Sequence, residues 1–174
     1  MIASITGSRS SASPSAGLPG AWASDGSYWV TSYTGSVGLT RVTPDDSVSQ
    51  PFGLKSAEVV ITQILPGDRT ALGTRQPMGS ATGPVVLLDL QSGDARTIIE
   101  DATVAARYAA GFLVYVLGDG SLQAAPFDLK SQRLTAPAVT LATGVTLTGQ
   151  GQAQFAVAAN GTVAFIAEAG RTLV

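Results

Sequence analysis

The sequence contains no cysteine and no histidine. Thiolate nucleophiles, disulfide bonds, imidazole general bases and the usual zinc ligands are therefore excluded. Charged residues make up only 13% of the chain, the net charge is −2, and lysine and arginine do not cluster. Because phosphate-backbone binding needs a basic surface, we expect no nucleic-acid partner.

Long hydrophobic runs are also missing. No hydrophobic window approaches the length of a membrane span, so we expect no membrane-spanning segment. The start of the chain, Met1 to Arg9, has neither the basic region nor the continuous apolar region of a signal peptide. We expect no targeting signal in the chain as given. The compartment stays open, because a protein without cysteine suits either redox environment.

Turn-forming residues are abundant, with 20 glycines and nine prolines beside a hydrophobic content of 45%. This balance favours short strands joined by frequent turns and predicts an all-β fold. A chain of 174 residues has the length of one domain, or part of one.

A repeat of apolar segment, glycine turn and apolar segment runs through the chain. The turn glycines lie 41, 44 and 50 residues apart, at Gly26, Gly67, Gly111 and Gly161. Asp89 and Asp128, each followed by leucine, lie 39 residues apart and repeat the same period. This period is typical of a four-stranded propeller blade, and tight hairpin turns need the positive φ that glycine tolerates. The sequence predicts about four antiparallel blades.

We expect an N-terminal arm over residues 1–19, followed by a partial propeller over 20–174 with units at about 20–53, 54–101, 102–148 and 149–174. Ser8 to Pro19 is rich in serine, alanine and proline, as flexible linkers are. Met1 to Thr6 has the β-branched residues to donate a strand. The last unit stops with its third strand barely begun, which suggests a fragment of a longer reading frame.

The predicted strands of the first two units lie near residues 21–24, 28–33, 37–43 and 47–51, then 57–65, 69–75, 84–90 and 95–99. Those of the last two lie near 103–109, 112–117, 121–128 and 132–141, then 152–157, 162–167 and 171–174. A helix over Glu100 to Ala110 is the rival to one strand, since this segment is rich in alanine.

The segments ASDGSYWV, ARYAAGFLVYVLGDGSLQAAPFDLKSQRLTAPAV and QAQFAVAANGTVAFIAE resemble TolB-type, WD-like β-propeller repeats, especially propeller modules attached to bacterial serine/threonine kinases. The usual Ser-Pro-Asp-Gly turn of that family is altered here, with Ala158, Ala159 and Asn160 before the last turn glycine. The resemblance covers about residues 20–174. It implies a scaffold that binds proteins, peptides or carbohydrate-like ligands, usually on the cell-envelope side, and it does not imply catalysis.

Most carboxylates fall at predicted turns, where aspartate bonds its local backbone. Four polar residues differ, because they lie on or beside predicted innermost strands that are otherwise apolar: Glu58, Gln63, Arg107 and Gln154. They either pair across neighbouring blades or form a ligand-facing patch along a channel. If they pair across neighbouring blades, Glu58 and Arg107 are candidates for an ion pair. The aromatic residues suit core or inter-blade packing, and an exposed Trp or Tyr near a rim suits a sugar or peptide.

These observations predict a non-enzymatic scaffold for protein, peptide or carbohydrate-like ligands or for self-assembly, with no cofactor, no metal and no catalytic residues. The alternative is a hydrolase-like activity that uses carboxylates at a channel mouth. An open arc of four blades leaves two apolar blade faces in water. We therefore expect a homodimer whose two arcs complete a ring of about eight blades, with closure as a single four-blade ring as the alternative.

Overall fold

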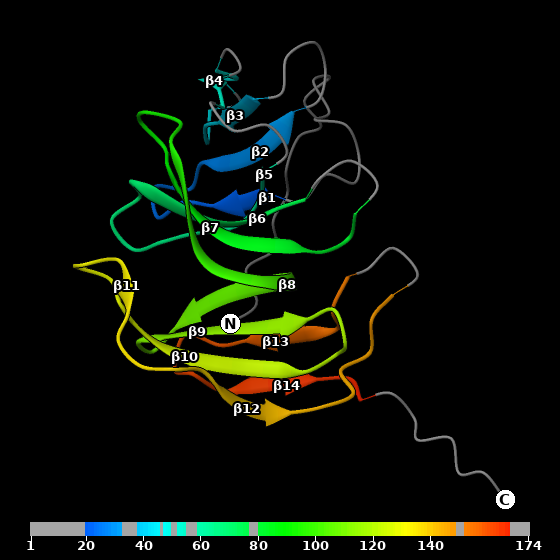
Figure 1. Ribbon diagram of the computed structural model, residues 1–174. Coiled ribbons are helices and arrows are strands. Elements are labelled where there is room, and N and C mark those ends of the chain that lie inside the picture. The colour runs from blue at the N-terminus through cyan, green and yellow to red at the C-terminus, as the bar shows by residue number, and fades with distance from the viewer. Residues whose placement is uncertain are drawn as a thin grey trace, which may run out of the picture.

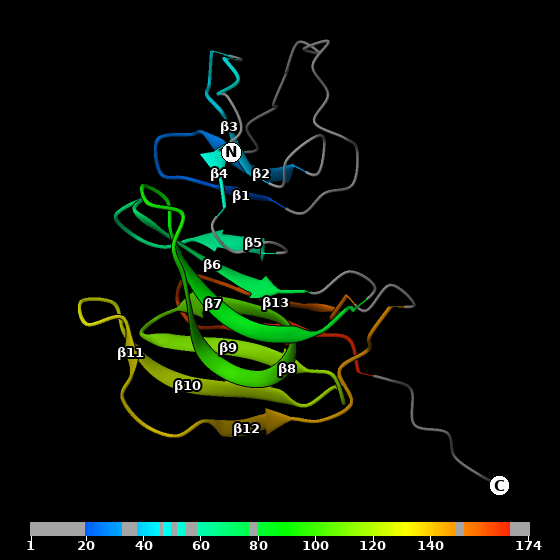
Figure 2. The ribbon, with the colours of Figure 1, turned by 45° about the horizontal axis from the view of Figure 1, so that its top comes forward.

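The computed structural model describes residues 20–32, 38–45, 47–49, 52–54, 59–76, 80–148 and 152–167. All assigned elements in these ranges are β-strands, and all their pairings are antiparallel (Figures 1 and 2). The all-β prediction, with propeller-type antiparallel blades, is confirmed. The predicted arm over 1–19 and the predicted strand at 171–174 lie outside the described residues.

Blade 1 is a four-stranded sheet in sequence order, made of β1 (Gly20–Trp22), β2 (Tyr28–Ser32), β3 (Gly38–Val42) and β4 (Phe52–Gly53). The expected outer strand at 47–51 is wrong, because β4 begins at Phe52. The N–H of Thr43 donates to the carbonyl of Ser47 and closes a turn, after which Val48 makes only an isolated bridge to Val42.

Blades 2 and 3 share one long strand. Blade 2 comprises β5 (Val59–Ile64), β6 (Thr70–Arg75), β7 (Gly83–Asp89) and the first part of β8 (Ala95–Ala109). Blade 3 comprises the rest of β8 with β9 (Phe112–Leu117), β10 (Leu122–Asp128), β11 (Arg133–Leu134) and β12 (Val139–Ala142).

The continuity of β8 corrects the sequence prediction of two strands, near 95–99 and 103–109, and the rival helix is not formed. Thr103 pairs with Gly83 of blade 2 and with Leu117 of blade 3. The strand therefore passes from the outer edge of one blade to the inner edge of the next without a turn. β-pairing on both sides of this residue overrides the helix propensity of the alanines.

The outer strand of blade 3, expected as one strand at 132–141, is split. Both β11 and β12 pair with β10, and Pro137 lies between them. Proline has no N–H for a sheet hydrogen bond, which suits an interruption at this edge. Blade 4 has β13 (Phe155–Val157) and β14 (Val163–Phe165), joined at one end by the bridges Val145–Ala167 and Leu147–Ala153.

The inner strands of the four blades contact one another in sequence order: β1 with β5, β5 with β8, and β8 with β13. In Figure 1, β1 to β4 of blade 1 lie at one end of the molecule, and the strands of blades 3 and 4 overlap at the other. All four turn glycines predicted from the repeat have positive φ, between 81° and 97°: Gly26, Gly67, Gly111 and Gly161. Three apolar clusters fill the spaces between successive blades.

Candidate functional site

Gln63 bridges two blades through its side-chain amide. Its Nε2 donates to the carbonyl of Tyr108 at 3.0 Å, and its Oε1 accepts from the N–H of Tyr108 at 2.7 Å. A register shift between Ile61 and Gln63 bulges Thr62, so that the Thr62 hydroxyl also donates across the seam, to the carbonyl of Ala106. A bulge re-aims side chains in this way. The seam between β5 and β8 is thus hydrogen-bonded by side chains.

Arg107 follows Ala106 on the same strand, β8. Its guanidinium donates from Nη1 to the carbonyl of Ala106 at 3.1 Å, the same carbonyl that accepts from Thr62. The side chain is half-buried, and burial lowers the pKa of the guanidinium because it disfavours the charged form. Gln63 and Arg107 therefore both bond to backbone groups of residues 106–108, but Gln63 reaches them from blade 2, whereas Arg107 lies on β8 itself.

Of the other two predicted site residues, only Gln154 is among the described residues. Glu58 lies outside the described residues, so its ion pair with Arg107 stays a prediction. Gln154 is exposed at the start of blade 4, where its backbone N–H donates to Thr146 and its carbonyl accepts from Ile166. Ligand binding by any of the four also stays a prediction.

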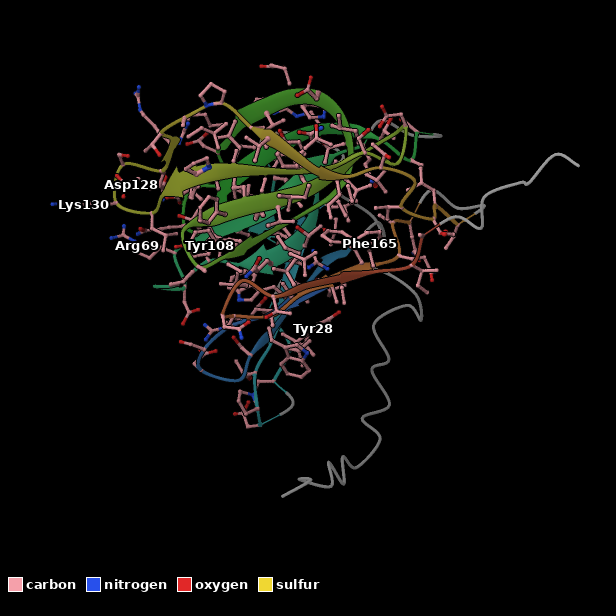
Figure 3. All side chains as sticks on the ribbon, turned by 90° about the horizontal axis from the view of Figure 1, so that it is seen from below. Tyr28, Arg69, Tyr108, Asp128, Lys130 and Phe165 are labelled. Atoms are coloured by element: carbon pink, nitrogen blue, oxygen red, sulfur yellow. The ribbon has the colours of Figure 1, made fainter. Side chains whose placement is uncertain are left out.

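Five aspartates at turns each accept a backbone N–H two residues ahead: Asp25, Asp45, Asp89, Asp119 and Asp128. These bonds, together with those from nearby serine or threonine hydroxyls, lower the pKa of every one of the five carboxyls. Asp128 and Lys130 project at the same end of the molecule as Arg69 (Figure 3). Such local bonding is the ordinary structural use of aspartate in a turn.

The pairing register shows how each blade contacts its neighbours. Beside the inner turns, the pairs Ile64–Ala71, Tyr108–Leu113 and Val157–Val163 occupy equivalent places in blades 2, 3 and 4. Each pair lies in the apolar cluster that joins its blade to the preceding blade. We call these cross-strand sets the front rows.

The next pair along each inner hairpin faces the opposite way, because side chains alternate on a strand. Leu72, paired with Gln63, lies in the cluster between blades 2 and 3, and Val114, paired with Arg107, lies in the cluster between blades 3 and 4. We call these sets the back rows. Gln63 and Arg107 hold equivalent back-row positions, and both face the following blade.

Among the described residues, no blade precedes the front row of blade 1. It runs across the sheet through the pairs Trp22–Tyr28 and Tyr28–Val42 and the bridge Val42–Val48. Trp22 is 69% exposed and Val48 is 48% exposed. The rings of Trp22 and Tyr28 lie 5.0 Å apart between centroids, and Tyr28 marks this end of the arc in Figure 3. Val30, two pairs farther from the turn on the same face, is buried, so the open part of this face is its turn end.

The sequence interpretation assigned these aromatic residues to packing, with an exposed Trp or Tyr near a rim as a sugar or peptide site, and did not identify the open row. A usable signal was present, since the front-row residue stands three or four positions before the turn glycine in every blade: Trp22, Ile64, Tyr108 and Val157. Only the contacts of the neighbouring blades show that this position faces backward along the arc.

Within the described ranges, no group of three or more acidic residues is arranged to hold a metal ion. The same residues include no helix that is long and apolar enough to cross a membrane.

No family model and no curated protein matches the chain. Among solved structures, the chain is similar to the crystal structure of the N-terminal domain of Nup159, with 17% identity and a TM-score of 0.46. The match covers 74% of this chain and 34% of that one, so the chain spans about a third of the matched structure. A likeness at this level carries no argument about function.

Proposed function

We propose that the chain is a non-enzymatic, TolB-type propeller scaffold that binds a macromolecular partner through the open front row of blade 1. The row of Trp22, Tyr28, Val42 and Val48 supports this most directly, because Trp22 and Val48 are exposed and Tyr28 and Val42 are half-buried. Aromatic side chains supply much of the energy of protein and peptide interfaces, and the largest apolar patches of soluble proteins are often binding sites.

The polar groups of the blade seams support a scaffold role as well. Gln63 and Arg107 bond to backbone carbonyls across or beside the seam between β5 and β8. Five aspartates are bonded to their own turns. These groups stabilise the blades and their connections, and binding is left to the apolar face.

The test is site-specific photo-crosslinking in cells that make the chain. A photoreactive phenylalanine analogue at position 22 is compared with the same analogue at position 139, because Val139 is also exposed but lies on the outer strand of blade 3. We expect discrete protein, peptide or glycan adducts from position 22 that position 139 does not give. Equal labelling from both positions, or none from position 22, would contradict the proposal.

A further inference from the structure

Blade 4 carries a back row that matches the open front row of blade 1. Ala156 pairs with Ala164 on β13 and β14, on the face opposite the Val157–Val163 pair that contacts blade 3. Both alanines are exposed. Ile166, two residues beyond Ala164 on the same face, is 58% exposed. By its register, this row is the surface on which a following front row would pack.

The two open rows are complementary in size. The front row of blade 1 presents the large rings of Trp22 and Tyr28, whereas the back row of blade 4 presents the methyl groups of Ala156 and Ala164. Large residues that face small ones interdigitate at native packing density. Neither row contains a charged residue, so their contact would desolvate no charge.

The two rows of one chain do not cover each other. Trp22 and Ile166 both keep more than half of their surface in solvent, which argues against the four-blade ring as the closed form. The three interfaces inside the arc are all front row against back row. A second copy of the chain can supply a fourth interface of the same kind.

We propose that the front row of blade 1 packs on the back row of blade 4 of a second copy of this chain, head to tail. This inference rests on the proposed function and names its partner. The contact is heterologous, because it joins two different surfaces. Each copy therefore has one front row and one back row available for such contacts.

The test uses the full chain with Trp22→Glu, which blocks the front row, and Ala164→Glu, which blocks the back row. Light scattering and sedimentation across a dilution series should show that either substitution raises the dissociation constant by about thirtyfold or more, as loss of an interface hot spot does. The matched control is Leu141→Glu, at an apolar residue that is 50% exposed on β12. It should associate like the unmodified chain.

Mixing the two blocked variants separates head-to-tail contact from other modes. Trp22→Glu keeps its back row and Ala164→Glu keeps its front row, so the mixture should form one intact contact and a 1:1 complex. Two copies joined front row to front row would gain nothing from mixing, because one of the two front rows stays blocked. Circular dichroism and melting curves confirm that each variant is folded.

A second readout follows the tryptophan itself. Trp29→Phe leaves Trp22 as the only tryptophan of the chain. Its quenching by acrylamide should fall as the protein concentration rises, and Ala164→Glu in the same background should abolish that fall. A monomeric mass at every concentration would overturn the inference. A crosslink from position 22 to a different protein only would also overturn it, while the proposed scaffold function would stand.

Discussion

At the scale of single residues, the aspartates show how the chain fixes its turns without disulfides. Asp89 accepts from the N–H groups of Ser92 and Gln91 at 2.7 and 2.9 Å, and Asp128 bonds the hydroxyl and N–H of Ser131 and the N–H of Lys130. A carboxylate bonded in this way is favoured in its charged form. The turns therefore depend on ionised aspartate.

We expect stability to fall in acid. The pKa of Asp128 is lowered, first by the Ser131 hydroxyl, and that of Asp89 is lowered, first by the Ser92 N–H. A lowered native pKa contributes stability above the ordinary aspartate value of about 3.9 and loses it as the pH falls through the native value. Urea unfolding at a series of pH values should show this loss below about pH 4. Asp128→Asn keeps an acceptor but does not titrate, so it should make this loss of stability shallower. A stability of the unmodified chain that does not change with pH would refute the role given to these aspartates.

Gln63 is expected to matter for stability. Replacing it by Leu leaves the N–H and carbonyl of Tyr108 without their side-chain partner inside the seam, and should lower the free energy of unfolding by about 1–3 kcal/mol. Chemical denaturation measures this change. Gln123→Leu is the matched control, because its amide donates only to the exposed Thr140 hydroxyl. An equal loss in the free energy of unfolding at both positions would show that the seam bonds contribute no more than an exposed hydrogen bond.

Gly83 is close-packed against the neighbouring strand. A Cβ at this position would lie 1.7 Å from the carbonyl oxygen of Arg75, so the backbone must move to accept one. Gly83→Ala should therefore cost about 1–3 kcal/mol, as overpacking does. At Gly53, a Cβ meets nothing within 4 Å, so Gly53→Ala serves as the control. Comparable melting temperatures for the two variants would disprove this account.

At the scale of elements, β8 joins blades 2 and 3 into one eight-stranded sheet. The turn of blade 3 adds further links, since Arg96 donates to the carbonyl of Gln132 and Gln132 donates to the Thr70 hydroxyl. Blade 4, in contrast, has two three-residue strands and many exposed positions within the described residues. The blades therefore differ in how strongly they are held.

Hydrogen exchange should show this difference. We expect the amides of β5 to β10 to open as one unit and to exchange slowest, because cooperative units follow shared strands and buried clusters. The amides of β13 and β14 should exchange faster. Mass spectrometry of peptides along β8 measures both parts of the strand. Exchange of Thr103–Ala109 together with blade 4 and before Ala95–Ile99 would rule out a cooperative unit.

The elements also show what the sequence can predict. Hairpins around Gly67 and Gly111 were found because positive φ selects glycine locally. The continuity of β8 was not found, because it depends on the pairing of Thr103 with strands on both sides. That pairing is a property of the sheet and not of the segment. Gln63 was recognised as a polar residue on an inner strand, but its partner, the backbone of Tyr108, has no sequence signature.

At the scale of the whole molecule, the prediction of two arcs in a ring of about eight blades follows if head-to-tail contacts close. Light scattering should then give twice the chain mass of 17.6 kDa, without larger species at high concentration. Closure is expected because an unclosed heterologous contact continues into filaments. A mass that grows steadily with concentration would show that the contact does not close at two copies.

Removal of residues 1–9 tests the separate prediction that the N-terminal arm donates a strand. Loss of association would support donation. Unchanged association would refute it and leave the contact between the two open rows as the sole basis of assembly.

A propeller is commonly pictured as a string of interchangeable modules, but a strand common to two blades makes them a single module. A cut between blades 2 and 3, by a protease or by a gene breakpoint, removes an edge from both. Duplication or loss of repeats, and any engineered insertion of a blade, should therefore succeed beside this pair and fail within it.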